Sequence, residues 1–316
     1  MGTVRVGTCF WTDRTMVKAW YPPEVCSAEA RLRYYAQRFS TVEVDSPYFA
    51  LPEPAVAEAW VDRTPPDFIF HVKAYGLMTQ HSVLERSLHP VLRELEHEVD
   101  EHGRVRKPSW EMVVASFELF RRFVEPLRAA GKLGGVLLQF PPYFAAMDAR
   151  QRERNLGYID QARDMLAGLP VLVEFRHPSW VLEESIGQTL RFLADRQLAF
   201  VSVDTPQFPG GTTMPPVDAV TAPWAYLRLH GRNRTTYFAR NASAADRFDY
   251  LYTPGKLDEL AVRAKNLASQ AETTWVMFNN CKNDYAPRNA RDMAAMLGDL
   301  VAETPGSLDG QLDLGV

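Results

Sequence analysis

The chain has 316 residues, of which 46% are hydrophobic and 23% are charged, and its formal net charge is −4. This composition is typical of a globular protein, and it excludes a collagen, a coiled coil and a chain that is disordered throughout. The net charge provides no overall attraction to nucleic acid or to acidic membranes.

The cysteine count and the hydropathy pattern indicate the cellular compartment in which the protein is expected. Only three cysteines occur, without a CxxC spacing, which favours a reducing environment over a disulfide framework. No run reaches the roughly 18 apolar residues of a membrane helix, and the N-terminal residues lack the pattern of a signal peptide. We therefore expect a cytoplasmic protein with no membrane partner.

Eight short runs rich in Val, Leu, Ile and aromatic residues follow one another along the chain, as is typical of buried strands. They cover residues 4–10, 41–46, 68–74, 135–140, 171–176, 199–204, 225–231 and 274–280. Helical patterns fill most of the gaps, at 27–39, 53–63, 158–169, 184–196, 256–270 and 290–303. Eight alternating strand–helix units predict an α/β fold, a single closed (β/α)8 TIM barrel. An open doubly wound sheet is the alternative, but GTCFWTD is not the glycine-rich turn that such a sheet normally has after its first strand.

Two of the gaps are unusual. Residues 75–132 are far longer than a standard crossover, and they contain a charged stretch at 93–110, read as a helix running into a loop, and a second helix at 113–131. They predict a helical insertion on the rim between the third and fourth strands. Residues 205–224 hold five prolines and two glycines, a pattern typical of a lid or binding loop. We expect one barrel domain over 1–303 and a flexible C-terminal tail over 304–316.

Polar side chains alternate with apolar ones inside the strands. Because one face of a barrel strand contacts the helices and the other points inward, the alternation predicts which side chains share the interior. The inward set consists of Glu43, Asp45, His71, Lys73, Glu174, Arg176, Ser202, Asp204, Arg228 and His230. Thr8, Gln139, Asn279 and Asn280 lie at or near the ends of the other three strands. Since barrel enzymes place their active sites at the carboxyl ends of the strands, we predict one site there.

The residue types in this set suggest roles. We expect Glu43, Glu174 and Asp204 to be catalytic, in acid–base chemistry or as a glycosidase-like pair. The expected substrate-binding residues are Thr8, Asp45, His71, Lys73, Gln139, Arg176, Arg228, His230, Asn279 and Asn280. The Lys and Arg side chains would hold a phosphate or carboxylate group. A plug of salt bridges without any activity is the alternative reading.

A metal site is a further alternative, because Glu43, Asp45, Glu174, Asp204 and His230 offer oxygen and nitrogen donors. The interleaved cations would repel a metal ion, and no HExxH spacing occurs, so we predict no metal ligands and no cofactor, with a divalent metal as the alternative. Arginines interleaved with aromatic residues over 230–252 are compatible with nucleic-acid binding.

Several stretches together carry a resemblance to a known family. They are VGTCFW near the start, YYAQRFSTVEVDSPYFALP at 34–52, GGVLLQFPP at 134–142, VLVEFRHPSW at 171–180, YLRLHGRN at 226–233 and VMFNNCKNDYAPRNA at 276–290. In this order they resemble the domain-of-unknown-function 72 family, also called YecE-like proteins, over about nine-tenths of the chain. The family usually has an Asn followed by Ser-Thr after the glutamate that corresponds to Glu43, where this chain has Val44, Asp45, Ser46 and Pro47. The resemblance implies a TIM barrel and no particular reaction.

Our first functional hypothesis is an enzyme acting on a small anionic, hydroxyl-rich substrate such as a sugar phosphate, as a hydrolase or isomerase. A nucleic-acid-processing or metal-dependent barrel is the second hypothesis, and a non-catalytic ligand-binding module is the third. The sequence indicates no oligomeric state.

Overall fold

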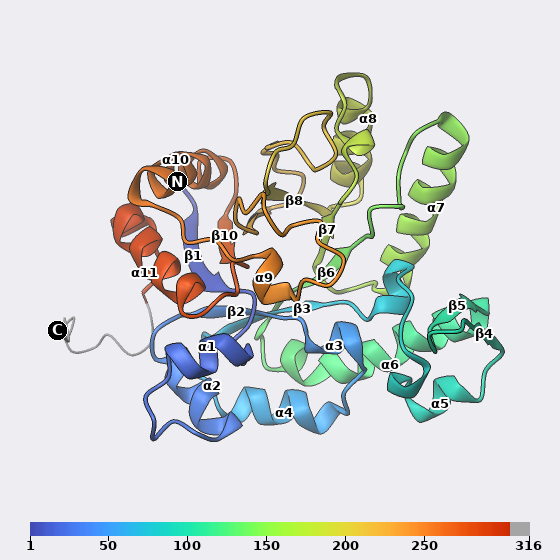
Figure 1. The fold of residues 1–316 in the computed structure, drawn as a ribbon, viewed down its shortest axis with the longest axis horizontal. Helices are drawn as coiled ribbons and strands as arrows, with labels where there is room; N and C mark the ends of the chain where they lie inside the picture. Colours follow the sequence, from blue (N-terminus) through green and yellow to red (C-terminus); the bar gives the residue numbers. More distant parts are fainter. Residues whose placement is uncertain (304–316) are drawn as a thin grey trace.

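The computed structural model describes residues 1–303, and they form a closed barrel of parallel strands surrounded by helices (Figure 1). The barrel strands are β1 (Thr3–Thr8), β2 (Thr41–Val44), β3 (Ile69–Lys73), β6 (Leu133–Gln139), β7 (Val171–Glu174), β8 (Ala199–Asp204), β9 (Trp224–Leu229) and β10 (Thr273–Phe278). Around the barrel they follow the order β1-β10-β9-β8-β7-β6-β3-β2. The predicted (β/α)8 architecture is confirmed. The predicted tail, 304–316, lies outside the described residues.

Seven helices cover the outside of the barrel in this part of the chain. They are α2 (Ala28–Ala36), α4 (Pro54–Asp62), α6 (Trp110–Ala129), α7 (Ala149–Met165), α8 (Glu183–Asp195), α10 (Pro254–Ala268) and α11 (Tyr285–Leu297). Local chemistry sets their starts: Ser27 and Ser109 accept hydrogen bonds from the backbone N–H groups of Ala30 and Met112. The pattern of expected helices is thus largely reproduced.

Shorter helices lie in the connections. The α-helical ones are α1 (Arg14–Ala19), α3 (Ser46–Phe49), α5 (Pro90–Arg93) and α9 (Ala244–Arg247). Four 3-10 turns cover Gly76–Thr79, Glu85–Ser87, Pro178–Trp180 and Gly298–Leu300. The connection from β8 to β9, residues 205–223, contains neither helix nor strand, as its prolines predicted. The helical layer is therefore interrupted beside β8.

The core fills the space between the strands and the helices. On one side of the barrel Trp60 of α4 stacks on Phe70 of β3, with 5.7 Å between ring centroids. Trp11 meets both rings edge-on, and Phe123 of α6 meets Trp60 in the same way. Buried aromatic contacts of this kind fix the helices against the barrel.

The insertion between β3 and β6 differs from its prediction in one part. The helix expected from residue 93 is wrong: α5 ends at Arg93, and β4 (His97–Val99) pairs antiparallel with β5 (Val105–Pro108). The Asp100 carboxylate accepts hydrogen bonds from the backbone N–H groups of His102 and Arg104, which closes a turn. This local bonding outweighs the helical propensity of the charged residues. The second expected helix is confirmed as α6, which begins at Trp110.

Candidate functional site

A buried arginine joins two glutamates across the carboxyl end of the barrel interior. The Arg228 guanidinium group on β9 donates to both carboxylate oxygens of Glu43 on β2, at 2.7–3.1 Å. Its Nη1 atom donates to Glu174 Oε2 on β7 at 3.0 Å. The two glutamates are 0% exposed and Arg228 is 2% exposed. As the alternation along β2, β7 and β9 predicted, these three strands, distant in sequence, direct their charged side chains to the same place inside the barrel.

Both carboxylates are fully hydrogen-bonded. The Tyr226 hydroxyl donates to Glu43 Oε2 at 2.8 Å. Glu174 Oε1 accepts from Gln139 at 2.9 Å and from Arg176 at 3.2 Å, and it lies 3.0 Å from the Nε2 atom of His230. Burial acts to raise the pKa of Glu174, but the nearby Arg228, His230 and Arg176 outweigh it and hold that pKa well below its usual range. Glu174 is therefore an anion at neutral pH.

His230 is held between Glu174 and β10. Its Nδ1 atom lies 2.9 Å from the Asn279 Nδ2 atom, so a neutral ring with its proton on Nε2 satisfies both neighbours. Burial lowers the pKa of His230 to about 3 even though Glu174 opposes this shift. The ring is therefore neutral, and it orients the carboxylate without adding a charge.

Lys73 and Asp45 lie next to this network and are both partly exposed. The Lys73 Nζ atom lies 4.1 Å from the centre of the Tyr48 ring. Burial, assisted by Arg228, lowers the pKa of Lys73 to about 8. Burial raises the pKa of Asp45, while Lys73 opposes that shift. An amine and a carboxyl group with altered proton affinities thus lie at the ends of β3 and β2.

Arg176 and His81 complete the partly exposed part of the site. Arg176 follows β7, its side chain is 19% exposed, and it donates to the Tyr237 hydroxyl at 2.8 Å. Burial lowers the pKa of His81 to about 3, and the positive charges of Lys73 and Arg176 act in the same direction. His81 also lines a cavity of about 600 Å³ between the insertion, α6 and α7. The site is therefore bordered by a concave surface.

Tyr226, Tyr237, Tyr48 and His81 are not among the predicted site residues. Tyr226 has the same parity as Arg228, so the alternation of β9 contains the signal for it. The other three lie in connections, where no periodicity indicates a direction. His81 lies against Tyr48 with 5.1 Å between ring centres.

Asp204 does not point into the barrel, so the predicted parity of β8 is wrong. Val201 and Val203 are in register with Tyr226 and Arg228 and share their inward face, which leaves Ser202 and Asp204 facing outward. Asp204 accepts hydrogen bonds from Arg232 and from the Tyr252 hydroxyl. Valine suits a barrel interior as well as its outer face, so alternation alone could not decide this strand.

Three further predicted site residues also lie outside the network. Thr8 faces α2, where its side chain and backbone bond to the Tyr35 hydroxyl. Asn280 donates to Tyr250 and Asn289. His71 points inward as predicted, but it is packed between Tyr226 and Trp275, and neither ring nitrogen has a hydrogen-bond partner among the described residues.

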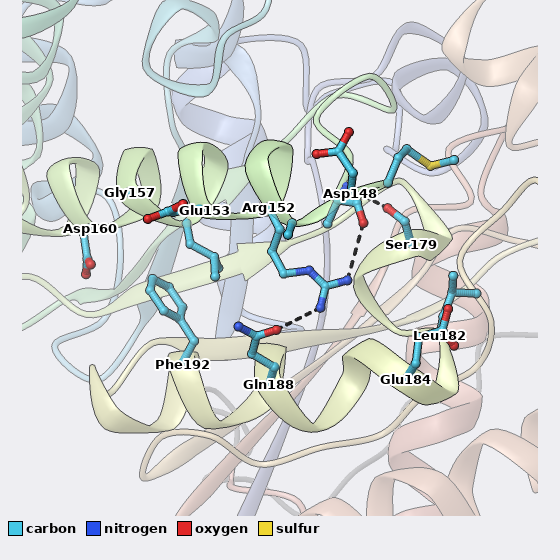
Figure 2. Close-up of a pocket in the computed structure, with 14 residues that line it drawn as sticks. Asp148, Arg152, Glu153, Gly157, Asp160, Ser179, Leu182, Glu184, Gln188 and Phe192 are labelled. Atoms are coloured by element: carbon cyan, nitrogen blue, oxygen red, sulfur yellow. Dashed lines mark hydrogen bonds between the residues drawn. The ribbon is translucent and has the colours of Figure 1, made fainter.

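A second cavity in the described residues lies away from this network. Figure 2 shows this space of about 810 Å³ between α7 and α8, where Arg152 donates to Gln188 at 2.9 Å. None of the predicted site residues lines it. We therefore place the candidate site at the charged network, because titratable groups with shifted pKa values gather there.

No group of three or more His, Cys, Asp or Glu side chains in residues 1–303 could hold a metal ion together. No helix in the same range is long and apolar enough to cross a bilayer.

Comparison with known proteins gives consistent matches over nearly the whole chain. A family model described as "Protein of unknown function DUF72" matches residues 5–309. The UPF0759 protein YunF of Bacillus subtilis (strain 168) is 27% identical over 314 residues, which are 98% of this chain and 99% of that protein. A solved DUF72 family protein of Thermotoga maritima MSB8 is 31% identical, with a TM-score of 0.72 over 93% of this chain and 99% of its own. One of Enterococcus faecalis V583 is 24% identical, with a TM-score of 0.74 over 93% and 95%.

Proposed function

The chain belongs to the DUF72 family, and we propose that it is an enzyme acting on a small anionic, hydroxyl-rich substrate at the carboxyl end of its barrel. The family's description contains no activity, so the proposal rests on the site. One observation carries it: Lys73 and Arg176 are partly exposed cations beside two buried carboxylates that Arg228 already pairs. The two cations therefore keep bonding capacity for an anion from solution.

Arg176 is the proposed anchor for the substrate's phosphate or carboxylate group. Its guanidinium group uses one nitrogen for Glu174 and another for Tyr237. Planar guanidinium donors suit phosphate and carboxylate oxygens, and partial burial strengthens such bonds. The Tyr237 hydroxyl beside it can bond to a substrate hydroxyl group.

Asp45 and Lys73 are the proposed proton-transfer pair. This changes the first hypothesis, in which Glu43 and Glu174 transfer protons. Each oxygen of those two glutamates already accepts a hydrogen bond and neither residue is exposed, so we assign them to positioning Arg228 and Arg176. The raised pKa of Asp45 and the lowered pKa of Lys73 bring both groups closer to neutral pH, as acid–base catalysis requires.

Nucleic-acid processing has weaker support. Arg232 in the 230–252 segment is engaged by Asp204 and Glu259, and Arg247 donates to the backbone carbonyls of Ala239 and Ala242. These arginines have bonding partners within the protein. The three free cysteines suit a reducing compartment, and we propose the cytoplasm as the site of action.

Anion binding is tested by following the melting temperature during titration with inorganic phosphate, at an ionic strength kept constant with KCl. We expect the melting temperature to rise for the wild type and for the surface control Arg33→Ala, because a ligand of the folded state stabilises it. Arg176→Ala should show no rise. A flat wild-type response would refute the proposal, and a rise only with Mn²⁺ or Zn²⁺ would replace it with the metal-dependent alternative.

Turnover is tested by proton NMR on a panel of sugar phosphates in D2O. Isomerisation replaces a carbon-bound hydrogen by deuterium, and hydrolysis releases free sugar, so the two reactions have different signatures. With a substrate of the panel, Asp45→Asn should lower the rate by roughly 100-fold or more while preserving the phosphate-induced rise in melting temperature. Wild-type turnover that is unaffected by Asp45→Asn would remove Asp45 from the mechanism.

A further inference from the structure

Among the described residues, Lys73 has no bonding partner, in contrast to the buried Lys132. The Lys132 ammonium group donates to the carbonyls of Val61 and Thr64 and to the Thr64 hydroxyl, at 2.8–3.0 Å. The Lys73 Nζ atom makes no hydrogen bond and has no carboxylate within 4.0 Å in the described part of the chain. It lies over the face of the Tyr48 ring, 4.1 Å from the ring centre. The amine is thus positioned by the end of β3 and still free to react.

The surroundings of Lys73 shift its protonation equilibrium toward the neutral amine. Arg228 is a permanent positive charge close by, and burial removes water from the side chain. With a pKa of about 8, roughly a tenth of the amine is uncharged at pH 7 and half is uncharged at pH 8. An unprotonated lysine in such a setting is an effective nucleophile toward carbonyl carbon.

We propose that Lys73 forms an imine with the carbonyl group of a small keto or aldehyde substrate that also carries a phosphate or carboxylate. This inference rests on the proposed function and names its substrate class. Arg176 would hold the anionic end, and the cavity lined by His81 would receive any part of the substrate beyond the carbonyl group.

The chemistry balances without an oxidant or a reductant. The Nζ lone pair forms a bond to the carbonyl carbon, the carbonyl π electrons move to oxygen, and that oxygen takes up the proton that the nitrogen loses. The resulting carbinolamine loses its hydroxyl group as water when protonated Asp45 supplies a proton, and the C–O bond breaks as the C=N bond forms. The iminium ion then withdraws electrons from the adjacent carbon and makes its C–H bond acidic, which is the step that an isomerase needs.

Reductive trapping tests the inference. The protein is incubated with pyruvate, glyoxylate, dihydroxyacetone phosphate or glyceraldehyde 3-phosphate in the presence of sodium cyanoborohydride, and the adduct is located by intact mass and peptide mapping. We expect one adduct per chain on the peptide that contains Lys73, with a rate that rises with pH to a midpoint near 8. Lys265→Met, which removes an exposed lysine of α10, should behave as the wild type.

Neither Lys73→Arg nor Lys73→Met should form the adduct. Lys73→Arg keeps the positive charge, so it should keep the phosphate-induced rise in melting temperature, which separates anion binding from covalent chemistry. The inference is refuted if all four carbonyl compounds leave Lys73 unmodified, or modify it no faster than Lys265. If trapping fails while phosphate binding and turnover are present, the imine is refuted and the proposed function stands. If either variant is unfolded, the mapped adduct of the wild type decides the question alone.

Discussion

Arg228 provides the positive charge that both buried glutamates bind directly. Its guanidinium group makes three of its hydrogen bonds to Glu43 and one to Glu174. Replacing it with Ala leaves two carboxylates in the interior without this partner, so we expect Arg228→Ala to lower the free energy of unfolding by about 3–5 kcal/mol. Urea denaturation measures this loss.

A surface pair provides the matched control. Arg33 binds Glu29 at 3.0 Å, and both side chains are about half exposed. Arg33→Ala should cost less than about 1 kcal/mol, because exposed ion pairs contribute little. A loss for Arg228→Ala as small as that for Arg33→Ala would mean that the network does not stabilise the barrel.

His71 predicts a particular dependence of stability on pH. Its folded pKa is lowered by burial to about 3, whereas an unfolded histidine titrates near 6.5. Between these values the unfolded chain binds a proton that the folded chain refuses, so stability falls as the pH drops. The loss is up to about 1.4 kcal/mol per pH unit for such a ring, and the contribution is complete above pH 6.5.

His71→Leu should therefore flatten the pH dependence of the free energy of unfolding between pH 6.5 and 4.5. His230, whose pKa is also about 3, keeps its own share of the slope in this variant. His102→Leu removes an exposed ring and should leave the slope as it is in the wild type. Equal slopes for the wild type and His71→Leu in urea titrations would contradict the argument.

Among the elements, β1 and β2 form the weakest seam of the barrel, and α2 reinforces it. Their pairing is limited to Thr8 with Val42, whereas β1 and β10 pair over six residues. The buried Tyr35 hydroxyl of α2 accepts from the Thr8 N–H group at 2.9 Å and donates to the Thr41 carbonyl at 3.0 Å. A side chain thus replaces ladder hydrogen bonds between the two strands.

We expect Tyr35→Phe to lower the free energy of unfolding by about 1–3 kcal/mol, because it leaves a buried N–H group and a buried carbonyl without partners. Tyr34→Phe is the control, since the same atom is removed from the neighbouring residue of α2, whose ring is covered by Arg38. Chemical denaturation of the two variants side by side decides the matter: equal stabilities would show that the seam does not depend on Tyr35.

The elements also show where sequence reasoning works. The alternation of charged and apolar residues along each strand placed Glu43, Lys73, Glu174, Arg228 and His230 correctly on the inward face. On β8 the same rule misplaced Asp204, since Val201 and Val203 suit either face of the strand. The contacts of Asp204 with Arg232 and Tyr252 depend on loop residues more than 25 positions away, which no local pattern records.

For the whole molecule, the barrel could be predicted because its signal is repeated eight times, so a single misread strand does not alter the architecture. The hairpin in the insertion could not be predicted, because it depends on the hydrogen bonds that the Asp100 carboxylate accepts from the backbone of its own turn. The site was predicted as a cluster but not in its detail. Which carboxylate is paired and which is accessible depends on the exact placement of Arg228, and this follows only from the closed barrel.

The interrupted helical layer implies that the barrel does not open uniformly. Residues 205–223, which follow β8, contain no helix, and β8 pairs with β7 over only two residues. Arg263 reaches across from α10 to bond the Val203 carbonyl at 3.0 Å and the Asp218 carboxylate at 2.7 Å.

Amide hydrogens of 199–204 should therefore exchange with solvent deuterium earlier than those of 273–278, because local opening needs fewer broken contacts there. Arg263→Met should accelerate this exchange at least several-fold in mass-spectrometric measurements, whereas Lys265→Met on the same helix should leave it unchanged. Uniform exchange in both segments would mean that the loop protects the strand as well as a helix does.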